Sequence, residues 1–313
     1  TPFYADGFLD EFQRRNLLDF TILGGKHRRN TLEYLKRERL QVDEGGQSRS
    51  YDVVLTCTDL IIQQNISGKK MVLVQEGMTE PEGLRYHLVR TFGLPRYLAN
   101  TSATGLSDAY DLFCVASPGY RKLFVQKGVR PEKIAVTGIP NFDHFNQYKK
   151  NDFPYHHYVL AATSNSREVF KPDNRVEFIR KVVNIAAGRR ILFKLHPNEN
   201  EIRARAEIER YAPGALIFED GNIHHMVANC DVLVTQTSSV TFIGLALDKE
   251  VHSDLNLKQL RALMPIQNEG TSAYLIADLC RQLAHQPRSG AQSQTQRAKP
   301  SFSLKKMIDS LHY

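Results

Sequence analysis

The sequence predicts an α/β protein made of two Rossmann-like domains that face a central cleft. Short apolar runs rich in β-branched residues recur between amphipathic stretches, as expected of parallel strands and the helices that cover them. The 313 residues exceed one domain of ordinary size, and segment 141–154 loses both periodicities and ends in a proline. We therefore expect an N-terminal domain over 1–145, a C-terminal domain over 146–286 and a flexible tail over 287–313 with a candidate terminal helix.

The N-terminal domain contains five runs with the composition of buried strands. They lie at 19–24, 51–56, 70–75, 111–116 and 133–138. Helical patterns occupy 6–15, 28–40 and 119–127, and Gly128 is placed as the C-cap of the last of them. These elements predict a parallel sheet with helices on its faces.

The C-terminal domain repeats this alternation. Its expected strands lie at 158–163, 190–195, 215–218 and 231–236. Its expected helices lie at 175–187, 200–211, 224–229 and 238–247. A strand followed each time by a helix is typical of a doubly wound fold.

Composition excludes several classes of protein. With 42% hydrophobic and 24% charged residues, the chain is neither collagen-like nor wholly disordered, and no apolar run approaches the roughly 20 residues that cross a bilayer. Four dispersed cysteines are interpreted as reduced, buried hydrophobes: Cys57, Cys114, Cys230 and Cys280. A net charge of +7 indicates an anionic partner, either nucleic acid, a phosphorylated small molecule or an acidic membrane face.

Candidate functional residues lie in the loops that follow the predicted strands, because ligands of open α/β sheets bind at the carboxyl ends of the strands. After the strand at 231–236, Thr237, Ser238 and Ser239 offer hydroxyl and backbone donors to a phosphate. After the strand at 190–195, His196 precedes Pro197 and offers either a hydrogen bond or a positive charge to a departing phosphate. The alternatives are plain helix capping for the hydroxyl residues and an ordinary polar loop residue for the histidine.

Two further loops complete the predicted cleft. Ser164 and Arg167 follow the strand at 158–163 in a loop without glycines, which excludes a Walker loop but allows a diphosphate to be held. Glu76 precedes Gly77 after the strand at 70–75, where a carboxylate can act as a general base. A solvated loop for Arg167 and an arginine-paired carboxylate for Glu76 are the alternatives.

Together these loops resemble the GT-B glycosyltransferase architecture over about residues 10–285. Segment 117–143 is similar to the connection between the two domains of that superfamily. The His196-Pro197 and Ser238-Ser239 pairs resemble the His-Pro and Ser-Ser motifs of bacterial sialyltransferases, Kdo transferases and CDP-glycerol glycerophosphotransferases. This resemblance implies a cytidine-activated donor, phosphate contacts from the histidine and the serines, and Glu76 as the base. Gln75 departs from the pattern, since several of those families carry a second acid there.

Segment 218–226 resembles the loop and helix that cover the nucleotide base in GT-B enzymes and in UDP-GlcNAc 2-epimerases, which implies donor contacts from Glu219 and Asp220. The epimerases are the nearest rival. They place glycines and a glutamate after the strand that here ends at Gln236, whereas this chain has no acid before Asp248. That difference weakens the epimerase and UDP-sugar interpretations.

The resulting functional prediction is a nucleotide-sugar-dependent glycosyltransferase of polysaccharide biosynthesis. It would move a Kdo-type, sialyl-type or other sugar from a donor, CMP- or CDP-linked rather than UDP-linked, to a surface-glycan or lipid-linked acceptor. The alternatives are a UDP-GlcNAc 2-epimerase-like or UDP-sugar enzyme and a CDP-glycerol glycerophosphotransferase. We expect no metal and no cofactor, because no Asp-x-Asp pair occurs in the sequence.

Two expectations concern partners and location. A nucleic-acid-binding module is disfavoured because the sequence contains no RNP-like, KH-like or zinc motif. We expect a cytoplasmic protein, with peripheral association at the inner membrane face through the basic residues of 26–29 together with Lys36, Arg37 and Arg39. A solvated charged helix is the competing and more common interpretation of that stretch.

Overall fold

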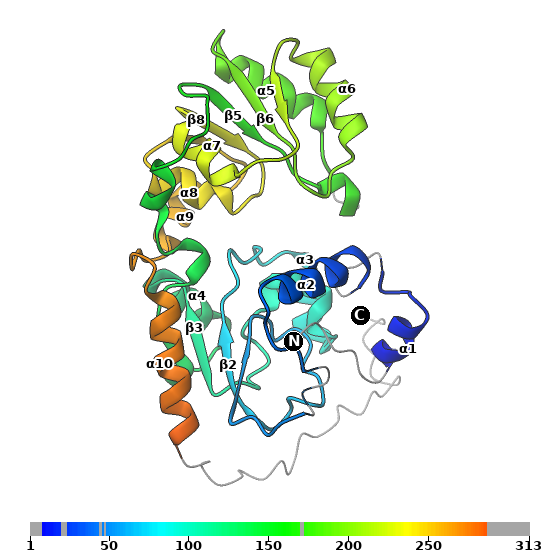
Figure 1. The fold of residues 1–313 in the computed structure, drawn as a ribbon, viewed down its shortest axis with the longest axis vertical. Coiled ribbons are helices and arrows are strands. Elements are labelled where there is room, and N and C mark those ends of the chain that lie inside the picture. The colour runs from blue at the N-terminus through cyan, green and yellow to red at the C-terminus, as the bar shows by residue number, and fades with distance from the viewer. Residues whose placement is uncertain (1–7, 20–23, 44–45, 47, 170–171, 287–313) are drawn as a thin grey trace, which may run out of the picture.

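The computed structural model describes residues 8–19, 24–43, 46, 48–169 and 172–286, which form two domains, each built on a parallel sheet (Figure 1). The N-terminal sheet has the order β1-β2-β3-β4, from strands Val53–Thr56, Lys70–Val74, Leu112–Val115 and Ile134–Val136. The C-terminal sheet has the order β7-β6-β5-β8-β9, from strands Leu216–Phe218, Ile191–Lys194, Val159–Ala162, Val232–Thr235 and Glu250–His252. The predicted α/β class with two Rossmann-like domains is confirmed.

The N-terminal domain contains several helices, of which α4 (Pro118–Lys127) packs on β3 and β4. Before it come α1 (Phe8–Arg14), α2 (Gly25–Arg37), α3 (Leu84–Phe92) and the 3-10 segment η2 (Arg96–Ala103). Helix α4 begins where Ser117 Oγ accepts the Tyr120 N–H and ends at Gly128, whose φ of +103° favours glycine. Residues 20–23 of the strand expected at 19–24, and the whole expected tail 287–313, lie outside the described residues.

Asparagine side chains begin most of the C-terminal helices. The helices are α5 (Arg175–Ala186), α6 (Glu201–Tyr211), α7 (Ile223–Asn229), α8 (Val240–Ala246) and α9 (Leu257–Leu263). Asn174, Asn200, Asn222 and Asn256 cap α5, α6, α7 and α9, each accepting a first-turn backbone N–H. For α5, α6 and α7, these caps explain why the helix starts predicted from the sequence agree with the structure to within a residue or two.

The last described helix, α10 (Ser272–His285), returns to the N-terminal domain and packs against β1 and β2 (Figure 1). Lys70 Nζ donates to the carbonyls of Leu283 and Ala284 at 2.9 and 3.0 Å and so caps the carboxyl end of the helix. At the other end, the Ser272 N–H donates to the buried Asp143 carboxylate at 2.7 Å. We expected this segment to close the C-terminal domain, and the structure places it on the N-terminal sheet.

The two domains meet in one continuous apolar core. Phe242 of α8 is fully buried, and its ring centroid lies 6.5 Å from that of Tyr120 and 6.0 Å from that of Phe142. Helices α4 and α9 touch backbone to backbone, since a Cβ at Gly119 would lie 1.9 Å from the Ala262 carbonyl oxygen. This joint sets the loops at the carboxyl ends of both sheets opposite each other. None of the described helices is both long and apolar enough to cross a membrane.

Candidate functional site

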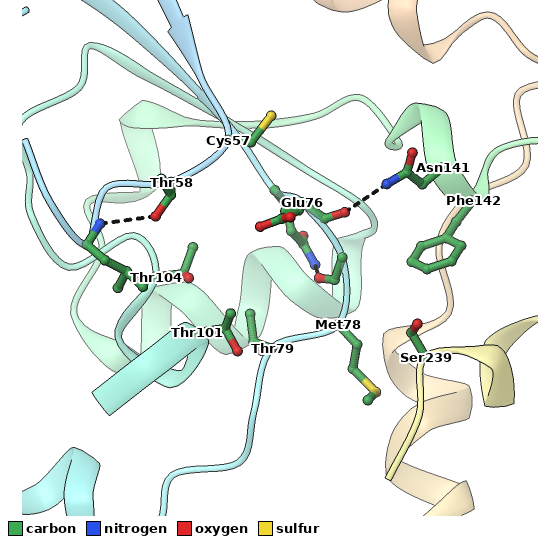
Figure 2. A pocket seen from close by; sticks show the side chains of 13 residues that line it. Cys57, Thr58, Glu76, Met78, Thr79, Thr101, Thr104, Asn141, Phe142 and Ser239 are labelled. Carbon is green, nitrogen blue, oxygen red and sulfur yellow. Dashed lines mark hydrogen bonds between the residues drawn. The ribbon is translucent and has the colours of Figure 1, made fainter. Parts of the chain in front are cut away.

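Two cavities meet where the domains face each other. The larger, of about 670 Å³, is lined by the loops after β1 and β2, by Thr101 and Thr104, and by Asn141, Phe142 and Ser239 (Figure 2). The smaller, of about 250 Å³, lies on the C-terminal domain and is lined by residues that include His196, Ser238 and Ser239. Phe142 and Ser239 line both cavities, so a molecule in one would lie next to a molecule in the other.

Glu76 lies in the wall of the larger cavity, directly after β2. Its backbone carbonyl accepts a hydrogen bond from Asn141 Nδ2 at 3.2 Å, and Figure 2 shows its carboxylate turned away from Asn141 toward the side where Thr58 and Thr104 lie. The side chain is exposed, and it is the sole carboxylate among the described residues lining this cavity. An exposed carboxylate facing a cavity can accept a proton from a bound hydroxyl group.

Gln75 holds the loop that carries Glu76. Its side chain is 2% exposed, Nε2 donates to the Gly77 carbonyl at 2.8 Å, and Oε1 accepts the Ala116 N–H at 2.9 Å. Only a group with both a donor and an acceptor makes these two bonds. The position at which the resembled families carry a second acid is therefore occupied by a structural amide.

Cys57 lines the same cavity and is exposed. The expectation that all four cysteines are buried is therefore wrong. Cys114 and Cys230 are buried as expected, and Cys280 is intermediate. Although the residue as a whole is exposed, its sulfur is partly shielded from water, and this desolvation, followed by the negative charge of Glu76, raises the pKa of the Cys57 thiol. The thiol next to Glu76 is therefore protonated and a weak nucleophile at neutral pH.

His196 is held in one tautomer by its neighbours. Its backbone N–H donates to Thr163 Oγ1 at 3.1 Å, and its Nδ1 accepts the Asn198 N–H at 3.2 Å, which leaves the ring proton on Nε2. Burial, and then the positive charge of Lys194, lower the pKa of the ring. At neutral pH the ring is uncharged, so of the two roles expected for His196 the structure favours hydrogen-bond donation.

Lys194 is a site residue that the sequence reasoning missed. Its side chain is buried, its Nζ donates to the carbonyls of Leu195 and Glu219 at 2.9 and 2.6 Å, and it lines the smaller cavity beside His196 and Pro197. Burial lowers the pKa of this ammonium. The sequence did contain a signal for this residue, because Lys194 lies near the end of the strand predicted at 190–195, two residues before the His-Pro pair.

The predicted hydroxyl residues after β8 are only partly brought together. Ser238 and Ser239 line the smaller cavity, and Ser238 Oγ also accepts the Val240 N–H at 3.3 Å. Thr237 is exposed and lines neither cavity. His224, on the segment expected to cover the base, also lines the smaller cavity, and its ring lies 4.4 Å from that of Tyr148.

Arg167 and Ser164 are engaged elsewhere. The Arg167 guanidinium donates to both carboxylate oxygens of Glu207 at 2.8 and 2.9 Å, and this pairing raises the pKa of the arginine. Ser164 Oγ lies 3.0 Å from Gln236 Oε1. Neither residue lines the two cavities, so Arg167 would have to leave Glu207 before it could bind a donor phosphate.

Glu219 and Asp220 line a third cavity of about 380 Å³ that also reaches Lys194 and His196. Glu219 pairs with Arg205, and hydrogen bonds from Glu201 and Arg205 lower its pKa. Carboxylates at this place could accept hydrogen bonds from the hydroxyl groups of a ribose. The described residues contain no group of three or more His, Cys, Asp or Glu arranged to hold a metal ion.

Comparisons with known proteins show the fold. No protein-family model and no curated protein matches the sequence.

Among solved structures, UDP-GlcNAc 2-epimerase from Neisseria meningitidis bound to UDP-GlcNAc aligns over 81% of this chain and 79% of its own, with 11% identity and a TM-score of 0.50. The Methanocaldococcus jannaschii UDP-GlcNAc 2-epimerase aligns over 80% and 78%, with 14% identity and a TM-score of 0.46. The wall teichoic acid polymerase TagF aligns over 74% and 73%, with 14% identity and a TM-score of 0.46. The chain thus has the two-domain α/β architecture of GT-B proteins.

Proposed function

We propose that this protein is a metal-independent transferase that moves a group from a cytidine-linked donor to a hydroxyl group of a surface-glycan or lipid-linked acceptor. One observation carries the proposal. The cavity that holds His196 and Ser238 and the cavity that holds Glu76 share Ser239 and Phe142. Two substrates bound on opposite domains would therefore meet at this shared wall, as a transfer reaction requires.

The donor side supplies groups that suit a phosphate. His196 offers its Nε2–H, Ser238 and Ser239 offer hydroxyl groups, and the Lys194 ammonium lies beside them. When the bond to the nucleotide phosphate breaks, the electron pair stays on a phosphate oxygen. Pre-oriented donors and a buried cation stabilise that charge more than water does, because they do not have to reorient when the charge develops.

The acceptor side supplies the base. Glu76 would take the proton of the attacking hydroxyl group while the hydroxyl oxygen forms its bond to the transferred group. The products are then the nucleotide, the extended acceptor and a protonated carboxyl that returns its proton to water. Three other carboxylates of the N-terminal domain, Glu80, Glu82 and Asp108, line neither cavity.

Epimerisation is the alternative that the fold neighbours bring forward, since the N. meningitidis protein is a UDP-GlcNAc 2-epimerase bound to UDP-GlcNAc. Inversion at one carbon requires proton removal and proton return on opposite faces of the same sugar, and thus two acid–base groups around it. Among the described residues lining the two shared cavities, Glu76 is the only carboxylate, and the two histidines, His196 and His224, line the donor-side cavity rather than the cavity that holds Glu76. That arrangement fits a single proton abstraction from an acceptor better.

The first test is ligand-induced thermal stabilisation with CMP, CDP, UMP, UDP, GDP and ADP in parallel. A ligand that binds only the folded chain stabilises it by about 2.7 kcal/mol at a hundredfold excess over Kd. We expect a shift with CMP or CDP only. A shift with UDP alone would favour a UDP-sugar transferase or epimerase, and no shift with any nucleotide would refute the proposed donor.

The second test separates the site from the fold. His196→Ala is expected to lower donor turnover by about a hundredfold or more, because it removes one oriented donor from the leaving phosphate. The matched control is His156→Ala, an exposed histidine of the same domain that lines neither cavity. Equal turnover in both variants would remove His196 from the mechanism, and release of an epimerised sugar without acceptor would replace transfer by epimerisation.

A further inference from the structure

The N-terminal domain exposes a concentrated apolar face that the proposed chemistry does not use. Of the 16 large hydrophobic side chains exposed among the described residues, six lie within segment 84–98: Leu84, Leu88, Phe92, Leu94, Tyr97 and Leu98. We call this surface of α3 and η2 the α3 face. Exposed hydrophobic residues are normal when scattered, whereas a contiguous group marks an interaction site.

Helix α3 has two opposite apolar sides. Tyr86 and Val89 are buried against the domain. Leu84, Leu88 and Phe92 are spaced four residues apart and form a second stripe, with exposed fractions of 76%, 41% and 68%. Because the body of the domain already occupies the first side, the second stripe is free to enter another apolar medium.

The charge of the segment indicates which medium that is. Residues 84–98 contain three arginines and no aspartate or glutamate. Arg96 donates to the Asp59 carbonyl. Glu82, just before α3, lies 3.9 Å from the Lys127 ammonium. Arg85 and Arg90 are exposed, and Arg85 follows Leu84 at the edge of the stripe. Leucine and aromatic side chains bordered by arginines, on a helix too short to span, suit the interface of a bilayer with anionic headgroups.

We propose that the α3 face docks on an anionic lipid bilayer. Its place in the fold gives this docking a use. Met78 and Thr79, just before α3, and Thr101 of η2 line the larger cavity, and Thr101 Oγ1 accepts the Glu80 N–H at 3.0 Å. Docking would hold the loop that precedes α3, which lines this cavity, near the lipid surface, where a lipid-linked acceptor could reach Glu76. The use rests on the proposed function, whereas the docking itself does not.

The test is co-sedimentation of the full chain with vesicles, without nucleotide, so that it can fail or succeed independently of the transferase proposal. Vesicles of phosphatidylcholine alone are compared with vesicles of phosphatidylcholine and phosphatidylglycerol in equal parts. We expect stronger binding to the anionic vesicles. Leu84→Gln with Phe92→Gln should weaken that binding by about tenfold or more, because two exposed apolar anchors are lost.

Two control variants make the result specific. Ile202→Gln with Tyr274→Gln removes the two other most exposed apolar side chains, which lie on α6 and α10, and should leave binding within about twofold. Arg85→Gln should weaken binding to the anionic vesicles by about fivefold and leave phosphatidylcholine binding unchanged. Far-ultraviolet circular dichroism confirms that each variant is folded.

Four outcomes would overturn the proposal. The native chain could fail to bind either vesicle, or the α3 variants could bind as well as the native chain. Binding lost instead in Arg29→Gln with Lys36→Gln would transfer the docking to the basic helix α2. A native dimer that becomes a monomer in the α3 variants, measured by light scattering, would show that a second copy covers this face.

Discussion

Replacement of Gln75 by glutamate tests whether this position can carry the second acid found in the resembled families. In the structure the amide donates to the Gly77 carbonyl and accepts the Ala116 N–H while buried. A protonated carboxyl can make both bonds, since its O–H replaces the amide N–H. An ionised carboxylate cannot donate, and it would face the Gly77 carbonyl oxygen without a hydrogen between them. Gln75→Glu should therefore be tolerated in acid and destabilising near neutral pH.

The magnitude follows from the burial of Gln75 and from the lost bond. A buried carbonyl without its donor costs about 1–3 kcal/mol, and the desolvated charge brings the expected loss to about 3 kcal/mol. Both effects raise the pKa of the new carboxyl in the folded state above its unfolded value. Between these two pKa values the folded chain binds more protons than the unfolded chain. Stability then falls by up to about 1.4 kcal/mol for each pH unit above about 4.3, and levels off above the folded pKa.

Urea denaturation at about pH 5 and about pH 8 measures this effect by the free energy of unfolding. Far-ultraviolet circular dichroism is the suitable signal because the chain has no tryptophan. The native chain corrects for other titrating groups, and Gln75→Met loses both hydrogen bonds at every pH. We expect Gln75→Glu to lose about 2 kcal/mol more than the native chain between the two conditions. A loss that does not change with pH, as expected for Gln75→Met, would refute the reasoning.

Four further outcomes are expected. Phe242→Ala removes a fully buried ring from between Tyr120 and Phe142 and should cost about 3–5 kcal/mol by urea denaturation, while an unchanged midpoint would contradict a shared interdomain core. Lys70→Met removes the ammonium that caps α10 and should speed hydrogen exchange in its last turn, and unchanged exchange there would show that the cap is dispensable. The His196 ring should titrate below 6.5 by NMR because burial lowers its pKa, and a higher value would contradict the neutral tautomer. As the pH falls below about 6.5 the unfolded chain takes up this proton before the folded chain does, so the contribution of His196 to stability is then lost. The proposed transfer should persist in EDTA, and its loss with recovery on adding a divalent cation would show that a metal is needed.

Much of the fold could be predicted because its signals are local. Buried parallel strands require uninterrupted apolar runs, so β2 and β8 were visible within a residue of their ends. The asparagine caps and Gly128 set helix ends through contacts within four residues. Four elements were missed: β9 has only three residues, α9 has only seven although Asn256 caps it, α3 carries apolar side chains on two sides, and α10 received no assignment.

The candidate site was predicted less completely because contacts with residues far away in the sequence decide which side chains reach the cavities. Each predicted loop follows the carboxyl end of a strand in the structure, as the doubly wound pattern requires. Arg167 has the right chemistry for a phosphate, but both terminal nitrogens of its guanidinium donate to Glu207 on α6. Lys194 was not selected from the sequence, and only the fold shows that its buried ammonium donates to two carbonyls beside His196.

The sequence by itself determined two doubly wound sheets, the loops at their carboxyl ends and the residues available there, because strand and helix periodicities are properties of neighbours in the chain. Only the tertiary structure decided that α10 lies on the N-terminal sheet, that Gln75 is a structural amide and that Glu76 and Ser239 line one cavity. An apolar face can pack against any of several apolar surfaces, and a polar side chain can bond to any of several groups of the same chemistry. The packing of the whole chain selects one of them.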